Sequence, residues 1–253
     1  MAVREIETLV LLPGLDGTDI FLQPLLRALP DSVRPLVITY PASGPNRYVD
    51  LLTVVREAVA GLQEFHVLGW SFSGPLALKL ANAEPQRVRS VILSASFVRP
   101  PRPELARFGG LVGGTAMWMW RAARRLPLWL LRPKSDPFRQ AKSETWRLLS
   151  ARVLAKRMRE VMNVDAREDL RACLQPVMYL AAGRDSVVPR RCVDEILRLR
   201  PSVEVETIEG EHFAMYFNPH AAARAIADFV VRASGDPQGN RFVQVEGPTE
   251  ILL

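Results

Sequence analysis

Three short turns of this 253-residue chain hold side chains that could do chemistry together: Ser71, Asp185 and His212. A serine hydroxyl is a weak nucleophile until a base takes its proton, and that base needs a third group to hold it in place. The three residue types therefore favour acyl transfer through a covalent intermediate. Ser71 would be the nucleophile, His212 the base and Asp185 the orienting acid.

The turn around Ser71 has the residue types of a nucleophile elbow. An apolar run at residues 65–70 leads into the sequence Gly69-Trp-Ser-Phe-Ser-Gly74, and a helical pattern follows directly. A sharp bend from strand to helix strains the serine backbone, and its neighbours must be small to avoid collision across the bend. Gly69, Ser73 and Gly74 meet that demand, with Ser73 standing where glycine is commoner. An ordinary Gly/Ser-rich turn of a doubly wound fold would look the same, so the rest of the chain must decide.

His212 is the best candidate for the base among the three histidines of the chain. It lies in the loop Glu209-Gly-Glu-His-Phe213, after an apolar run at residues 203–208, and open α/β sheets bind ligands at the ends of such strands. His66 lies within the strand before the elbow, where we expect a structural role. His220 begins a helix, which suits a solvated or capping role.

Asp185 is the best candidate for the acid. It occupies the turn Gly183-Arg-Asp-Ser-Val-Val-Pro189, and a β-like run at residues 177–182 leads into that turn. An aspartate at this place could instead cap the helix that begins near Pro189.

The elements that must position these side chains alternate between strands and helices. Strand patterns lie at residues 6–12, 33–40, 65–70, 88–93, 177–182 and 203–208. Helical patterns lie at residues 21–29, 48–62, 75–81, 190–199 and 219–231. This alternation predicts an α/β fold with a doubly wound, mostly parallel sheet of about six strands and helices on both faces.

The segment at residues 99–171 breaks the alternation, because it shows no convincing strand pattern and several prolines divide its helical stretches. We interpret it as a helical cap inserted before the acid-bearing strand. Residues 1–98 and 172–233 would then form the core, and residues 234–253 a C-terminal tail or an extra edge strand. Residues 99–159 hold fifteen Lys and Arg against three acids, a balance of +12. We expect the apolar side chains of the cap to roof the site and its arginines to face the solvent.

The chain resembles the α/β-hydrolase fold superfamily, of the serine esterase type with a helical cap. The resemblance extends from Ile6 to about Arg232, and the three turns occur in the family's order of serine, acid and histidine. It implies an oxyanion hole formed by the backbone N–H groups of Leu15 and Phe72. The usual His-Gly of the loop before Leu15 is Pro13-Gly14 here, so no histidine side chain acts there.

The resemblance also implies that the cap covers a pocket for the acyl or leaving group. The apolar content of the cap indicates a greasy pocket, and the candidate lining residues are Trp70, Trp118, Trp120 and Phe213.

These patterns predict a serine hydrolase that cleaves a carboxylic ester without a metal ion or cofactor. An acyltransferase or thioesterase acting on acyl-carrier-protein or coenzyme A substrates stays open, as does a non-catalytic hydrolase-fold binding protein. The expected substrate is a small-molecule or lipid-like ester. The basic cap could receive an acidic carrier protein or an anionic membrane surface, and we do not expect nucleic acid. The cap's charge and the Gly-Trp-Ser elbow are similar to those of esterases that act on a carrier-protein-bound pimeloyl ester in biotin synthesis.

The sequence also bears on the compartment. It contains no apolar run long enough to span a bilayer, and residues 1–7 do not have the profile of a signal peptide, so we expect a cytoplasmic protein. Cys173 and Cys192 lack metal-ligand spacing and are expected to be buried, reduced thiols.

Overall fold

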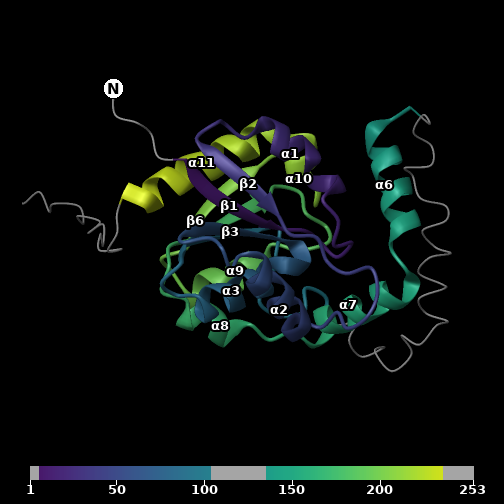
Figure 1. Ribbon diagram of the computed structural model, residues 1–253, viewed down its shortest axis with the longest axis horizontal. Coiled ribbons are helices and arrows are strands. Elements are labelled where there is room, and N and C mark those ends of the chain that lie inside the picture. The colour runs from purple at the N-terminus through teal and green to yellow at the C-terminus, as the bar shows by residue number, and fades with distance from the viewer. Residues whose placement is uncertain (1–5, 104–134, 236–253) are drawn as a thin grey trace, which may run out of the picture.

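A six-stranded, all-parallel sheet forms the centre of the computed structural model, which describes residues 6–103 and 135–235 (Figure 1). The strand order is β2-β1-β3-β4-β5-β6. The strands are β1 (Glu7–Leu12), β2 (Val33–Val37), β3 (Phe65–Trp70), β4 (Val88–Ser94), β5 (Val177–Ala182) and β6 (Glu204–Ile208). The predicted fold class is confirmed.

Burial along the strands follows their place in the sheet. Every residue of the central strand β3 is buried, whereas the edge strands β2 and β6 each have one buried residue. Pro35 lies in β2, where the missing N–H of proline is tolerated because one side of an edge strand has no neighbour.

Helices cover both faces of the sheet (Figure 1). One layer contains α1 (Gln23–Ala28), α10 (Ala214–Phe217) and α11 (Pro219–Gly235). A short 3-10 helix, η1 (Ile20–Leu22), directly precedes α1. The other contains α2 (Tyr48–Ala58), α3 (Gly74–Ala83), α8 (Arg167–Ala172) and α9 (Arg191–Leu199). Successive β1 residues point into opposite layers, since Leu9 and Leu11 join the core under α11 while Val10 and Leu12 join the core under α2 and α3.

Helices α6 (Pro137–Leu148), α7 (Ala151–Asn163) and α8 lie between β4 and β5. The first two lie within the predicted insertion, and α8 ends one residue beyond it. The side chains of Asp136 and Ser150 cap the N-termini of α6 and α7 by accepting bonds from the third backbone N–H beyond them. α6 and α7 extend past one end of the sheet, whereas α8 packs on the core, where the Asn82 side chain of α3 donates to the Asp169 carbonyl (Figure 1). The two described helices that can roof the site are therefore α6 and α7.

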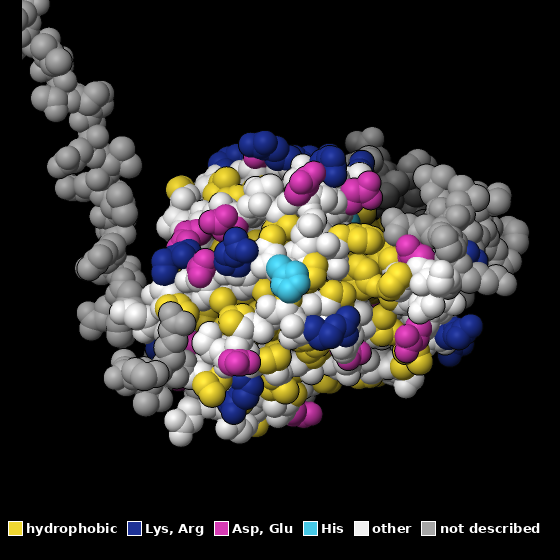
Figure 2. All heavy atoms as spheres, turned by 90° about the horizontal axis from the view of Figure 1, so that it is seen from above, with side chains coloured by type: hydrophobic (Ala, Val, Ile, Leu, Met, Phe, Trp, Pro, Cys, Tyr) yellow, Lys and Arg dark blue, Asp and Glu magenta, His cyan; other side chains and the backbone are white. Residues whose placement is uncertain are grey.

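The layer of α1 and α11 presents basic and acidic side chains interspersed, with apolar side chains between them (Figure 2). Across the described ranges, no helix is both long and apolar enough to cross a membrane. Cys173 and Cys192 are buried free thiols, and burial raises the pKa of both. The C-terminal tail or extra edge strand predicted at residues 234–253 lies outside the described residues, apart from Ser234 and Gly235, which are the last residues of α11.

Candidate active site

Ser71 stands at the sharp turn between β3 and α3, in a short 3-10 segment, η2 (Ser71–Ser73). Its φ of 52° lies in the left-handed region, which residues other than glycine rarely adopt. The bend brings the backbone so close that a Cβ at Gly69 would lie 2.4 Å from the Ser73 carbonyl oxygen. The hydroxyl of Ser96 donates to the Ser71 carbonyl at 2.6 Å and holds the turn from the β4 side. The expected strain and the need for small neighbours are both present.

Ser73, the residue that replaces the commoner glycine, has a structural use of its own. Its fully buried hydroxyl donates to the Pro13 carbonyl and lies 2.5 Å from the Tyr40 hydroxyl, which can donate to it. This contact joins the elbow to the loop after β1, the loop that holds Leu15. The sequence explained Ser73 by the need for a small residue. The structure shows in addition that its hydroxyl links the elbow to the loop after β1.

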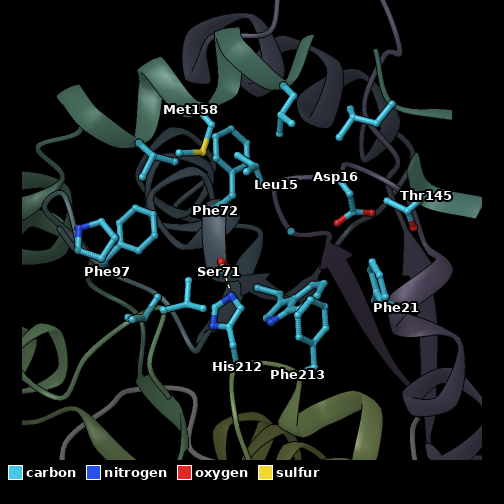
Figure 3. A pocket seen from close by; sticks show the side chains of 18 of the residues that line it. Leu15, Asp16, Phe21, Ser71, Phe72, Phe97, Thr145, Met158, His212 and Phe213 are labelled. Atoms are coloured by element: carbon cyan, nitrogen blue, oxygen red, sulfur yellow. Dashed lines mark hydrogen bonds between the residues drawn. The ribbon is translucent and has the colours of Figure 1, made fainter. Parts of the chain in front are cut away.

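The imidazole of His212 lies between the other two predicted residues. Its Nε2 is 2.9 Å from Ser71 Oγ (Figure 3). Its Nδ1 is 2.8 Å from Asp185 Oδ2. Ser71 and His212 are each only 9% exposed, so water has little access to the bond between them. The ring of Trp70 stacks beside the imidazole at a centroid distance of 6.0 Å, with 28° between the ring planes.

Asp185 uses both carboxylate oxygens. Oδ1 accepts the backbone N–H groups of Val187 and Val188, each at 2.8 Å, while Oδ2 faces His212. These two bonds hold the turn itself; they do not cap the following helix, as weighed from the sequence, because α9 begins at Arg191 with Arg190 as its N-cap residue. Because an ionised carboxylate only accepts, His212 Nδ1 must carry the proton, which leaves Nε2 free to accept the serine proton.

The other two histidines lie away from this site. His66 is fully buried in β3, with Nδ1 2.7 Å from Ser90 Oγ and Nε2 3.3 Å from a Glu7 carboxylate oxygen. Burial lowers its pKa, partly opposed by Glu7. His220 lies in the first turn of α11. In the part of the chain that the structure describes, no group of three His, Cys, Asp or Glu side chains could hold a metal ion.

Leu15 and Phe72, the predicted oxyanion donors, both line the cavity that contains Ser71 (Figure 3). A turn closed by a bond from Gly17 N–H to the Gly14 carbonyl at 3.0 Å carries Leu15. Phe72 is anchored by Tyr48, whose ring stacks on the Phe72 ring at 4.8 Å and whose hydroxyl donates to the Phe72 carbonyl at 2.8 Å. The turn bond holds Leu15, and Tyr48 holds Phe72 from outside the cavity.

The cavity has a volume of about 390 Å³ and is mainly apolar. Phe97 and Met158 lie to one side of Ser71, and Phe21 and Thr145 to the other (Figure 3). The predicted Trp70 and Phe213 line it, whereas Trp118 and Trp120 lie outside the described residues. The sequence did not single out the cap side chains that complete the wall, because their spacing equally suits packing onto the core: Thr145, Trp146, Leu149, Leu154, Met158, Val161 and Met162.

One arginine of the cap contradicts the expectation that these side chains face the solvent. Arg147, Arg152 and Arg159 are exposed, but Arg157 of α7 is 0% exposed. Its guanidinium donates to partly buried backbone carbonyls in the loop of Leu15, which sequence periodicity could not reveal. Burial lowers the pKa of Arg157 to about 10, so it stays charged at neutral pH.

Comparison with known proteins agrees with this architecture. The family model for the alpha/beta hydrolase family matches residues 9–225. The chain is 24% identical over 245 residues to the "Putative carbamate hydrolase RutD" of a Caulobacter strain, covering 88% of this chain and 90% of that protein. It is 28% identical over 184 residues to a pimeloyl-[acyl-carrier protein] methyl ester esterase of Neisseria meningitidis, covering 68% of this chain and 59% of that protein.

Solved structures share the fold at low sequence identity. One from work on the carboxylesterases of Nitrososphaera gargenis has a TM-score of 0.71 at 16% identity and covers 93% of this chain and 94% of its own. The enol-lactonase of Burkholderia xenovorans has a TM-score of 0.69 at 17% identity, with coverages of 90% and 92%. The chain belongs to the alpha/beta hydrolase family, and its relatives are hydrolases.

Proposed function

We propose that this protein is a serine hydrolase that cleaves carboxylic esters through an acyl-enzyme intermediate. The observation that carries the proposal is the continuous hydrogen-bonded series from Ser71 through His212 to Asp185, with links of 2.9 and 2.8 Å, at the wall of an apolar cavity. These distances already suit proton transfer, so the free site is arranged for nucleophilic attack.

In the first half of the reaction, Ser71 Oγ bonds to the ester carbonyl carbon and passes its proton to His212 Nε2. The carbonyl π electrons move to oxygen, and the N–H groups of Leu15 and Phe72 stabilise the resulting oxyanion. Collapse of the tetrahedral adduct breaks the bond to the alcohol, which leaves with the proton from His212. Asp185 keeps the imidazole oriented and stabilises its positive charge.

In the second half, water attacks the acyl-enzyme and gives its proton to His212 Nε2. Collapse breaks the carbon–Oγ bond, releases the carboxylic acid and returns the proton to Ser71. No step requires a group other than these residues and water.

The cavity supports an uncharged acyl chain of medium length as the preferred substrate part. Its wall is mainly aliphatic and aromatic, and burial of a chain there would contribute about 0.8 kcal/mol for each CH₂ removed from water. Carbamates stay within the same chemistry, because they too have a carbonyl carbon and a leaving group.

The test is a chain-length series of p-nitrophenyl esters, with carbamates and acyl thioesters beside it, assayed on wild type and Ser71→Ala. We expect ester hydrolysis that rises with chain length and then falls, and a loss on the order of 10⁶ in kcat for Ser71→Ala. Ser202→Ala, in an exposed turn, is the matched control. Hydrolysis that survives in Ser71→Ala would overturn the nucleophile, and turnover of thioesters alone would redirect the proposal to a thioesterase.

We further propose that the exposed basic side chains of the cap receive an acidic carrier protein that presents the acyl group. The support is the +12 balance of residues 99–159, the exposure of three of its arginines on α6 and α7, and the carrier protein in the name of one relative. Such docking would act through steering that weakens with salt.

Charge reversal tests this partner. Replacing Arg147, Arg152 and Arg159 by Glu should leave a small neutral ester unaffected and slow turnover of a carrier-bound ester. Added salt should mimic the change, because the Debye length falls from about 10 Å at 0.1 M to about 3 Å at 1 M. The matched control reverses three exposed arginines outside the cap, Arg27, Arg198 and Arg224. Equal effects of the two triple variants, or a response only to anionic vesicles, would refute the carrier.

A further inference from the structure

Arg157 is a buried cation that the mechanism above does not use. Its Nη1 donates to the carbonyl oxygens of Leu15 at 3.0 Å and Asp16 at 2.6 Å, and its Nη2 donates to the Pro41 carbonyl at 3.1 Å. Its Nε donates to Asn46 Oδ1 at 2.9 Å. One cap side chain thus holds two loops of the core, the loop after β1 and the loop after β2.

The loop after β1 is shaped around this guanidinium. Two successive carbonyls, of Leu15 and Asp16, converge on one nitrogen, which an extended strand with alternating carbonyls could not provide. Gly17 follows with a φ of +71°, and a Cβ there would lie 2.4 Å from Arg157 Nη1. The turn that carries Leu15 therefore has the conformation that the guanidinium requires.

The same guanidinium is linked to the elbow. It lies over the Tyr40 ring at 5.4 Å, and the Tyr40 hydroxyl is 2.5 Å from Ser73 Oγ, which in turn donates to the Pro13 carbonyl. The loop after β1, which carries Leu15 and which we call the oxyanion loop, is thereby held by the elbow through Pro13 and by the cap through Leu15 and Asp16. Removing the guanidinium would leave the two partly buried carbonyls of Leu15 and Asp16 without this donor.

We propose that Arg157 is a positioning residue of the oxyanion hole: from the cap helix α7, it fixes the loop that presents the Leu15 N–H to the reacting carbonyl. This inference rests on the proposed hydrolase function. It makes the oxyanion hole dependent on the docking of α7, so the cap contributes to the chemical step as well as covering the substrate.

Neighbouring contacts of α7 provide the control. Lys156 donates to the Gly44 carbonyl at 2.7 Å, and Glu160 accepts the Tyr48 N–H at 2.9 Å. Both contacts dock α7 against the β2–α2 region without reaching the loop of Leu15. Lys156→Met therefore removes one contact of α7 and leaves the four guanidinium bonds that hold the helix and the loop of Leu15 in place, whereas Arg157→Met removes those bonds.

The experiment compares wild type, Arg157→Met, Arg157→Lys and Lys156→Met for kcat and KM on the best p-nitrophenyl ester, with thermal unfolding to verify folding. Each protein is also titrated with an aryl trifluoromethyl ketone. Ser71 Oγ adds to its carbonyl carbon, the serine proton passes to His212, and the new oxyanion occupies the hole. Direct loss of an oxyanion donor costs 10²–10³, so for the indirect loss in Arg157→Met we expect kcat to fall about 10- to 100-fold. KM should change little, and the inhibition constant of the ketone should rise by a factor similar to the loss in kcat. Arg157→Lys should recover part of the kcat and part of the affinity for the ketone. Lys156→Met should retain both the kcat and the ketone affinity of wild type.

Several outcomes would overturn the assignment. Wild-type kcat and ketone affinity in a folded Arg157→Met would do so, as would an equal loss in Lys156→Met or a change confined to KM. If Arg157→Met does not fold, the same criteria apply to Arg157→Lys. A wild type that forms the ketone adduct without cleaving any ester refutes the proposed substrate class, and ketone affinities then decide the role of Arg157. A wild type that does neither refutes both proposals.

Discussion

Replacing Asp185 by Asn separates the chemical role of this residue from its shape. The wild-type carboxylate accepts two backbone N–H groups on Oδ1 and the His212 Nδ1–H on Oδ2, all at 2.8 Å. An asparagine has one accepting oxygen and one donating NH₂ group. Because the oxygen must stay with the two backbone donors, the NH₂ group must face His212.

The magnitude follows from the cost of the opposite orientation. Turning the NH₂ toward Val187 and Val188 would leave the partly buried Val188 N–H without an acceptor, at about 1–3 kcal/mol, whereas the exposed Val187 N–H can bond to water instead. Every 1.4 kcal/mol is a factor of ten, so the productive orientation is rarely populated. The NH₂ group then donates to Nδ1, so the imidazole carries its proton on Nε2. In this tautomer Nε2 cannot accept the proton of Ser71. A triad with this tautomer loses about 10⁴ in kcat.

The assay is kcat on the p-nitrophenyl ester for Asp185→Asn and Asp185→Ala, with ¹⁵N shifts of the His212 ring to identify the tautomer. We expect the kcat of Asp185→Asn to be no higher than that of Asp185→Ala, although asparagine keeps the shape of aspartate. The reason is that alanine imposes neither tautomer on His212, whereas asparagine favours the inactive one. Activity of Asp185→Asn within tenfold of wild type, or an Nδ1–H tautomer in that variant, would refute the reasoning.

Two further predictions concern stability. Burial lowers the pKa of His66 below its ordinary 6.5, so the unfolded chain binds more protons than the folded one between that lowered pKa and pH 6.5. The contribution of neutral His66 to the free energy of unfolding is therefore complete above pH 6.5. It is lost as the pH falls through this window. Urea unfolding at pH 7.5 and 5.5 should show a larger acid-induced loss for wild type than for His66→Gln, and equal losses would contradict the burial argument. Gly74→Ala would place a Cβ 1.9 Å from Ser96 Oγ, so we expect about 1–3 kcal/mol of destabilisation in urea unfolding. Adding Ser96→Gly should relieve part of it, and wild-type stability of Gly74→Ala would show that the elbow has room.

The strands were predictable because hydrophobic periodicity is a local signal. The patterns at residues 65–70 and 177–182 coincide with β3 and β5, and the others differ from their strands by few residues. β2 ends at Val37 rather than residue 40 because the Tyr40 N–H donates to the Gly17 carbonyl, in the loop after β1, instead of continuing the ladder. α2 ends at Ala58, four residues before the predicted end, with Gly61 in the turn that follows. Such boundaries depend on tertiary contacts that periodicity does not contain.

The three candidate catalytic residues were predictable for a different reason. Chemistry restricts each role to few residue types, and parallel strands deliver their carboxyl ends to one edge of the sheet, so three turns at strand ends sufficed to bring Ser71, Asp185 and His212 together as candidates. Their hydrogen bonds bridge sequence separations of 27 and 141 residues. No comparable restriction acts on cavity walls, which many apolar side chains can form.

Arg157 marks the limit of that reasoning. In the sequence it is one of fifteen cations in a basic segment, on a helix whose polar residues would all be assigned to the solvent. Its acceptors are backbone carbonyls 116 to 142 residues away and one asparagine oxygen 111 residues away, and backbone carbonyls have no sequence signature. A buried guanidinium is tolerable because its planar fork meets all four acceptors at once, which the point charge of a lysine could not do. The consequence is that the cap and the oxyanion loop cannot vary independently: any change that displaces α7 also removes the donor for two carbonyls beside the reacting centre.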